Sequence, residues 1–184
     1  MHDDNLYQQY FEPIKRYLVR FVGETYAEEL AQEVFIKVAK SSEGFRGESS
    51  IKTWIYRIAT NQAKDFLKSR YKKDSDAISE SDLEQYDAAR FDEDSPEYLN
   101  ITTEMNDCIK EFIHRLPHDY CTVLLLSELE GHKIKEISEI LGVSENTIKV
   151  RLHRARAKLK DEMRQGCIVT TTCDSRIVCE RKEK

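Results

Sequence analysis

The stretch KIKEISEILGVSENTIKVRLHRARAKL, from Lys133 to Leu159, has the pattern of two short helices joined by a tight turn. The expected first helix has apolar residues at three- and four-residue steps, at Ile134, Ile137 and Leu141. Gly142 then suits the left-handed conformation of a turn, and the Ser144 hydroxyl can cap the free amides of a second helix. We predict that this second helix begins at about Glu145. The pattern is typical of a helix-turn-helix, which binds DNA through its second helix.

The second helix is predicted to have an apolar side and a cationic side. Its apolar line consists of Ile148, Leu152, Ala155 and Leu159. The opposite side, which we expect to face the major groove, carries Asn146, Lys149, Val150 and His153. The arginine and lysine side chains on the flanks of this helix are expected to reach phosphates rather than base edges. The whole predicted duplex-binding set is Ser144, Asn146, Thr147, Lys149, Val150, Arg151, His153, Arg154 and Arg156. A basic helix can also be a solvated surface, but the turn and the cap beside it favour DNA binding.

The composition favours a helical protein. Charged residues make up 34% of the 184 residues and hydrophobic residues 40%, with only six glycines and three prolines. This composition suits helices better than a turn-rich sheet protein, and strand-like alternation is scarce before the last residues. We therefore predict an all-α fold of two small helical domains joined by an acidic flexible linker, the second of them the helix-turn-helix domain.

Charge is segregated along the chain, although the net charge is only −5. Residues 52–73 hold seven Lys or Arg against one acid, and residues 149–164 hold seven against two. Between them, residues 74–107 hold twelve acids against one Arg. Dense like charge with few large apolar side chains predicts a segment that does not fold alone. The pattern therefore predicts two cationic surfaces separated by an anionic connector.

Three helices are predicted in the N-terminal part, at about residues 5–22, 26–40 and 51–70. The third has a core stripe of Ile51, Trp54, Ile55, Ile58 and Phe66. A second, polar and cationic stripe of the same helix contains Thr53, Arg57, Thr60, Asn61, Lys64 and Lys68. The spacing of Trp54 favours a place in the core over a base-stacking surface. The predicted boundaries are domains at 1–73 and 101–165, a linker at 74–100 and a cysteine-containing tail at 166–184.

No segment predicts export or membrane insertion. No apolar run approaches the roughly twenty residues of a membrane span. The N-terminus, MHDDNLYQQY, is acidic and polar, whereas a signal peptide is basic and then apolar. We therefore expect a cytoplasmic protein that is not inserted in a membrane.

The five cysteines argue against a disulfide framework in such a compartment. Cys108 and Cys121 lie in helical segments, where a small buried thiol is the ordinary case. Cys167, Cys173 and Cys179 lie in the tail at equal six-residue steps. Three thiolates can bind zinc or copper(I), or form a redox switch. An inert tail is nevertheless favoured, because a tetrahedral site lacks a fourth ligand, so we predict no metal site and no cofactor.

Three segments of the chain resemble the sigma factors of bacterial RNA polymerase, in the compact extracytoplasmic-function (ECF) group. They are AEELAQEVFIKVAK, FRGESSIKTWIYRIATNQAKDFLKSR and LPHDYCTVLLLSELEGHKIKEISEILGVSENTIKVRLHRARAKLK, in the order and spacing of the family. The resemblance covers nearly everything except the linker and the tail. It implies a factor that directs core RNA polymerase to promoters. The partners that it implies are core polymerase and promoter DNA, and an anti-sigma factor is a possible further partner in this family.

The resemblance also implies roles for individual residues. The first domain is expected to bind the polymerase and open the minus-ten element, and the second to read the minus-thirty-five element. The polymerase-binding residues that it implies are Glu28, Glu29, Gln32, Glu33 and Ile36. The residues that it implies for capturing the minus-ten non-template strand are Phe45, Arg46, Gly47, Glu48, Ser49, Ser50, Thr53, Arg57, Asn61 and Lys64. A loop of this kind admits an unstacked base, and adjacent cations hold the strand backbone.

One alternative comes from another class of protein, the free-standing helix-turn-helix transcription regulator that is not a polymerase subunit. Such regulators usually bind paired half-sites as dimers. Here the other domain carries FRGESSIKTW at residues 45–54, which suits single-stranded DNA and favours the sigma factor. The chain has no phosphate-binding glycine loop and no HExxH motif, so we predict that it is not an enzyme.

Overall fold

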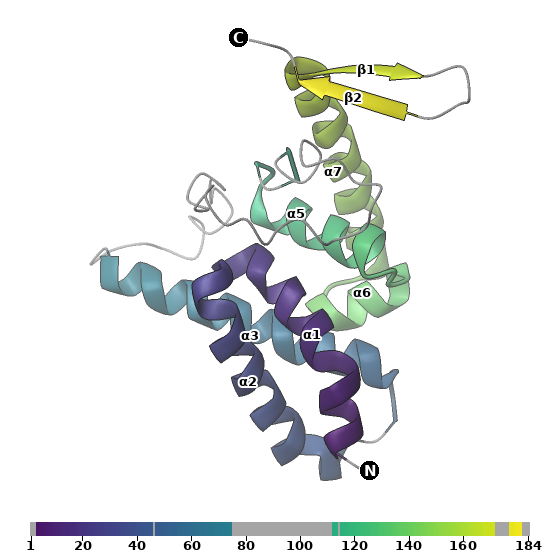
Figure 1. The fold of residues 1–184 in the computed structure, drawn as a ribbon. Helices are drawn as coiled ribbons and strands as arrows, with labels where there is room; N and C mark the ends of the chain where they lie inside the picture. The colour runs from purple at the N-terminus through teal and green to yellow at the C-terminus, as the bar shows by residue number, and fades with distance from the viewer. Residues whose placement is uncertain (1–2, 46, 75–111, 114, 172–176, 182–184) are drawn as a thin grey trace.

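A computed structural model describes residues 3–45, 47–74, 112–113, 115–171 and 177–181. The N-terminal unit consists of α1 (Asp3–Val22), α2 (Glu24–Ser41), the 3₁₀ turn η1 (Ser42–Gly44) and α3 (Ile51–Asp74). The C-terminal unit consists of α5 (His118–Leu124), the π-helical turn η4 (Leu125–Leu129), α6 (Ile134–Leu141) and α7 (Glu145–Gly166). Strands β1 (Cys167–Thr171) and β2 (Ile177–Arg181) follow α7 (Figure 1). No helix in this described part is long and apolar enough to cross a membrane.

Helices α1, α2 and α3 pack around an apolar core, because each presents apolar side chains at helical spacing. Ile14 of α1 and Ile55 of α3 are completely buried. Tyr17 of α1 is also fully buried, and its hydroxyl shares a 2.9 Å hydrogen bond with the Thr60 hydroxyl of α3. These contacts hold α3 against α1, and they fix which side of α3 stays accessible.

The helix-turn-helix has the turn chemistry that the sequence predicts. Gly142 follows α6 in the left-handed conformation, with φ 68° and ψ 30°. The Ser144 hydroxyl accepts the Thr147 amide at 3.1 Å, which is the hydrogen bond of an N-cap. Ile148 and Leu152 are buried, and α7 packs on both α5 and α6. The prediction of a capped second helix beginning at Glu145 is therefore confirmed.

The two helical units lie against each other, with α6 beside α3 (Figure 1). Their buried apolar side chains form one cluster that extends from Leu6 in α1 to Ala155 in α7. Sequence patterns predicted two domains and a linker, and no sequence pattern indicated a contact between the domains. Of the predicted linker at 74–100, only Asp74 is described, as the last residue of α3; the others lie outside the described residues.

The all-α fold class is confirmed for both units, with one addition in the tail. β1 and β2 form an antiparallel hairpin in which Val169 pairs with Cys179. Figure 1 shows this hairpin at the far end of α7, away from α1–α3. In the C-terminal unit, α5 ends at Leu124 and a π-helical turn follows it directly.

Candidate nucleic-acid interface

The outer face of α7 is the predicted duplex-binding face, and the structure leaves it accessible. The four side chains expected in the major groove are all exposed: Asn146, Lys149, Val150 and His153. Val150 is 42% exposed although it is apolar. In a major groove, such a face can offer hydrogen-bonding groups and a cation to base edges, and an apolar contact to a thymine methyl group.

Two of the flanking arginines have acidic partners within the C-terminal unit. Arg151 lies 2.7 Å from Asp119 of α5, and Arg156 lies 2.6 Å from Glu128. The four side chains are between 27% and 58% exposed. Because exposed ion pairs contribute little free energy, these arginines can exchange their carboxylates for DNA phosphates. Arg154 is exposed on the same helix.

A hollow of about 460 Å³ lies beside the loop that precedes α3. Its lining residues are Gly44, Phe45, Glu48, Ser49, Trp54, Arg57 and Glu139. Trp54 is 7% exposed and packs on Phe45 with 5.0 Å between the ring centroids. It therefore belongs to the core, as its spacing predicts, and also forms one wall of the hollow. Aromatic rings next to the exposed Arg57 guanidinium suit an unstacked base and its phosphate.

The predicted polar and cationic stripe of α3 is divided by tertiary packing. Arg57 and Asn61 are exposed, but Thr53 and Thr60 are only 1% and 2% exposed. These two threonines of the stripe are not accessible, because α1 covers Thr60 and the C-terminal unit covers Thr53. Lys64 is half-buried, and this burial lowers the pKa of its ammonium group.

The loop before α3 is anchored at its end. The Ser50 hydroxyl accepts the Thr53 amide at 3.0 Å and caps the helix. Gly47 has φ 73°, a conformation that favours glycine, and Glu48 is exposed. Arg46 lies outside the described residues. The accessible middle of this loop and its fixed end place Glu48 and Ser49 at the rim of the hollow.

The predicted polymerase-binding residues lie on one side of α2. All five are exposed: Glu28, Glu29, Gln32, Glu33 and Ile36. Lys15 of α1 lies 2.8 Å from Glu28, and Gln62 of α3 donates a 2.8 Å hydrogen bond to Glu33. Ile36 is 53% exposed, a large apolar side chain next to acidic ones. An apolar centre with a polar rim is the usual anatomy of a protein interface.

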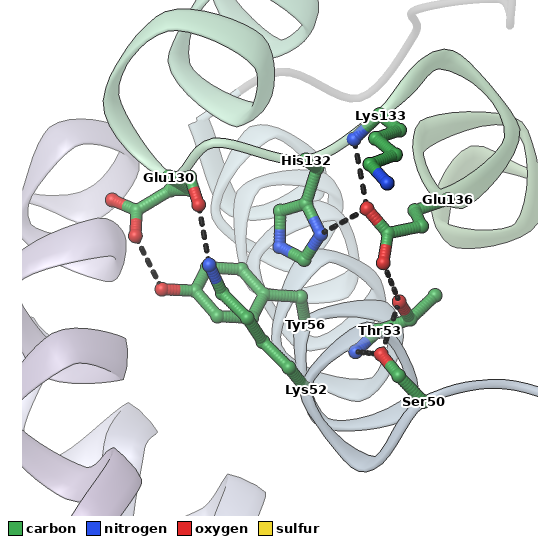
Figure 2. Close-up of polar contacts among 8 residues, drawn as sticks. All are labelled: Ser50, Lys52, Thr53, Tyr56, Glu130, His132, Lys133 and Glu136. Atoms are coloured by element: carbon green, nitrogen blue, oxygen red, sulfur yellow. Dashed lines mark hydrogen bonds and ion pairs between the residues drawn. The ribbon is translucent and has the colours of Figure 1, made fainter.

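The segment between η4 and α6 contacts α3 through polar groups that sequence reasoning missed (Figure 2). The Glu130 carbonyl accepts a hydrogen bond from the Lys52 ammonium group, and the Glu130 carboxylate accepts one from the Tyr56 hydroxyl. The Glu136 carboxylate accepts the Thr53 hydroxyl at 3.4 Å. The paired residues are 74 to 83 positions apart, so no local pattern connects them. Glu139, on the wall of the hollow, was missed for the same reason.

His132 lies inside this contact. Its ring packs edge-on against Tyr56, with 4.7 Å between the centroids, and its Nδ1 lies 3.7 Å from the Glu136 carboxylate. The residue is 4% exposed. Burial, and then the nearby Lys52 charge, lower the pKa of the imidazole to about 4. The packed contact therefore favours the neutral ring.

Acidification from pH 7.5 to 5.5 is expected to lower the free energy of unfolding. His132 has a pKa near 6.5 when unfolded and about 4 when folded, so the unfolded state binds the additional proton. Its contribution is complete above about pH 6.5 and falls as the pH drops towards 4, by on the order of 1 kcal/mol at pH 5.5. His118, whose pKa burial also lowers, acts in the same direction. Urea unfolding of the wild type and of His132→Phe at both pH values measures how much of the change in the free energy of unfolding depends on His132. An identical change in the two proteins contradicts the contribution of His132.

Of the described cysteines, one lies in the core and two lie in the β1–β2 hairpin. Cys121 is buried, so the prediction of a small buried thiol is confirmed, and burial raises the pKa of this thiol to about 12. Cys167 lies in β1 and Cys179 in β2. Cys108 and Cys173 lie outside the described residues. The prediction that the tail holds no metal site therefore stays a prediction.

The chain matches two protein-family models. Sigma-70 region 2 matches residues 6–73, and Sigma-70, region 4 matches residues 106–159. Among curated relatives, the ECF RNA polymerase sigma-E factor of Haemophilus influenzae is 35% identical over 162 residues, which cover 86% of this chain and 85% of that protein. The RNA polymerase sigma factor SigZ of Bacillus subtilis is 36% identical over 168 residues, 91% of this chain and 89% of the relative.

Two solved structures share the fold. The sigma factor RpoE from Bartonella quintana, in complex with the anti-sigma factor NepR, has a TM-score of 0.65 at 20% identity, covering 88% of this chain and 96% of that one. CnrH in complex with the cytosolic domain of CnrY has a TM-score of 0.62 at 19% identity, and the match covers 89% of this chain and 88% of that one. The two matched regions, the relatives aligned over most of their length and the exposed helix-turn-helix agree: the chain belongs to the ECF group of the sigma-70 family, the factors that direct core RNA polymerase to promoters.

Proposed function

We propose that the chain binds core polymerase through α2, captures the melted minus-ten strand at the hollow beside α3, and reads the minus-thirty-five element through α7. The observation that supports this division best is that one chain combines an exposed helix-turn-helix with a hollow that is lined by two aromatic rings and Arg57, and also by two glutamates. A protein that reads only duplex DNA needs no site for an unstacked base.

At the minus-thirty-five element, base edges are contacted by the outer face of α7, which is Asn146, Lys149, Val150 and His153. Phosphates are contacted by Arg151, Arg154 and Arg156, the first and last after release of their carboxylate partners. Ser144 and Thr147 lie at the N-terminus of α7, where the helix amides favour an anionic phosphate. The rigid α7 then sets the register, while the arginines supply most of the salt-dependent affinity.

At the minus-ten element, an unstacked base enters the hollow against Phe45 and the wall formed by Trp54. Glu48 and Ser49 lie at the rim, and the exposed Arg57 and Asn61 hold the strand beyond it. Lys64 and Thr53 lie further into the contact with the C-terminal unit, so they reach the strand only when that unit moves away.

The domain boundaries proposed from the sequence are 1–73 and 101–165, with the linker at 74–100 and the tail at 166–184. We propose that the protein has no enzymatic activity of its own, since nucleotide addition belongs to the polymerase. We also propose that it acts in the cytoplasm, where promoter DNA and polymerase meet. The complexes of RpoE with NepR and of CnrH with CnrY support an anti-sigma factor as a further partner.

Transcription with purified core polymerase on fragmented genomic DNA tests the proposal. Addition of the protein is expected to produce transcripts with new, mapped 5′ ends that core polymerase alone does not make. A free-standing regulator, the alternative, neither associates with core polymerase nor creates such starts. Absence of both association and new starts contradicts the proposal.

Lys149→Ala is expected to change base preference at one position of the minus-thirty-five element. Its exposed ammonium group can donate to guanine O6 and N7, a contact that contributes about 1–3 kcal/mol of discrimination against other bases. Competition among duplexes with single substitutions measures the change. An unaltered preference profile removes Lys149 from the base-reading set.

Arg154→Ala is expected to weaken binding to all sequences evenly. Loss of one phosphate contact lowers the slope of log affinity against log salt by about one. Titrations of the same duplex at several salt concentrations measure the slope. A selective loss at one base pair, with the slope intact, assigns Arg154 to base recognition instead.

A further inference from the structure

An acidic edge of the C-terminal unit covers the side of α3 on which the minus-ten strand is proposed to bind. We define this acidic edge as Glu130, Glu136 and Glu139. Glu130 precedes α6, and the other two lie on α6. Its side chains reach α3 at two hydroxyl groups, and Glu139 lines the hollow together with Phe45 and Trp54. Figure 2 shows Glu130 and Glu136 directed at α3 from the same segment.

Three donors of α3 that suit a nucleic-acid backbone are engaged by oxygens of this edge. The Lys52 ammonium group donates to the Glu130 carbonyl, and the Tyr56 hydroxyl donates to the Glu130 carboxylate. The Thr53 hydroxyl donates to the Glu136 carboxylate at 3.4 Å. Ammonium and hydroxyl groups are the donors that proteins direct at phosphate oxygens. Oxygens of the acidic edge therefore occupy positions that suit strand phosphates.

Glu136 is held by the start of its own helix, and Glu130 is held by a residue of α1. The Glu136 carboxylate accepts the Lys133 amide at 2.8 Å, as the N3 residue of a capping box does. The Glu130 side chain is 15% exposed and lies 3.9 Å from Arg20, which is 5% exposed. Interactions between such shielded charges are stronger than those between solvated ones. The contact is thus built from fixed, partly buried groups.

The arrangement of the two units also differs from the one that a promoter requires. Elements centred near minus ten and minus thirty-five are about 25 base pairs apart, or roughly 80 Å along B-form DNA. In the structure, Glu139 of the C-terminal unit forms part of the hollow proposed for the minus-ten base. Units in direct contact cannot bind both elements at once, so the promoter-bound state has the units apart.

We propose that the acidic edge is an internal mimic of nucleic acid, which occupies the strand-binding side of α3 in the free chain and competes with the minus-ten strand. The proposal rests on the proposed minus-ten role of α3. Free protein binds single-stranded DNA weakly, because the strand must displace a partner in the same chain. Separation of the units, when both promoter elements and the polymerase are engaged, exposes α3 and the hollow together.

Charge reversal at the edge tests the mimic. Glu130→Lys places a cation beside Lys52 and Arg20, and is expected to raise the radius of gyration in small-angle scattering. It is also expected to raise affinity for a fluorescein-labelled 12-nucleotide DNA strand of mixed sequence by about tenfold, the effect of losing charge-assisted hydrogen bonds. Glu136→Gln is a milder variant whose amide oxygen can still cap α6. It is expected to shift both measurements in the same direction, by less.

Asp161→Lys is the matched control, because it makes the same charge change at an exposed position of α7 outside the proposed contacts. It is expected to leave the radius of gyration unchanged and to report any effect of net charge on strand affinity. The mimic is overturned if both edge variants keep the wild-type radius, or if they open and bind the strand no better than the control. If neither wild type nor opened variant binds the strand at all, the proposed role of α3 fails, while an increased radius still shows the contact.

Discussion

Replacing Ile36 with aspartate is expected to lower the affinity of this sigma factor for core polymerase by about a hundredfold, with the fold intact. Ile36 is 53% exposed on α2, and substitutions at exposed positions change stability little. An apolar side chain at the centre of an interface contributes about 2–4 kcal/mol when it acts as a hot spot, and a buried carboxylate there adds a desolvation penalty. Titration of labelled core polymerase measures the loss, and circular dichroism checks the fold.

Val150→Asp is the matched control for this experiment. Val150 is a large apolar residue of α7 that is 42% exposed, so the substitution makes a similar chemical change on the other functional face. It is expected to keep wild-type affinity for core polymerase and to lose promoter-specific starts, because a carboxylate in the major groove repels phosphates and loses the apolar contact. Equal loss of polymerase affinity in both variants contradicts the assignment of the polymerase interface to α2.

Ile148→Ala is expected to destabilise the protein by about 2–5 kcal/mol, the usual range for a completely buried aliphatic side chain. Ile148 has 0% exposure and joins α7 to the rest of the C-terminal unit. The adjacent Lys149 is exposed, so Lys149→Ala is expected to change stability by less than about 0.5 kcal/mol while it alters base preference. Chemical denaturation of the three proteins measures both values. Similar stability of Ile148→Ala and wild type contradicts the burial of this helix face.

The local features of the helix-turn-helix could be predicted because they depend on residues close together in the chain. A glycine that tolerates positive φ, at Gly142, and a hydroxyl that reaches the amide three positions later, at Ser144, act within one turn. The buried line through Ile148 and Leu152 likewise follows from helical periodicity. The same periodicity placed Trp54 in the core.

The tail and the α5–η4 segment show where local patterns are less decisive. Residues 167–171 have the length of an ordinary strand, but it is the pairing of β1 with β2 that satisfies their backbone groups. Similarly, the apolar run through Leu125 and Leu126 is buried, as its composition suggests, but composition does not distinguish a π-helical turn from a regular one.

By itself, the sequence determined the helical faces, the turn and cap of the DNA-binding motif, the charge segregation and the resemblance to sigma factors. Only the tertiary structure decided that Thr53 is covered, that Lys52 and Tyr56 donate to Glu130, and that Glu139 borders the hollow. The physical reason is that periodicity tells which side of a helix is polar, whereas the neighbour that covers this side comes from a residue more than seventy positions away.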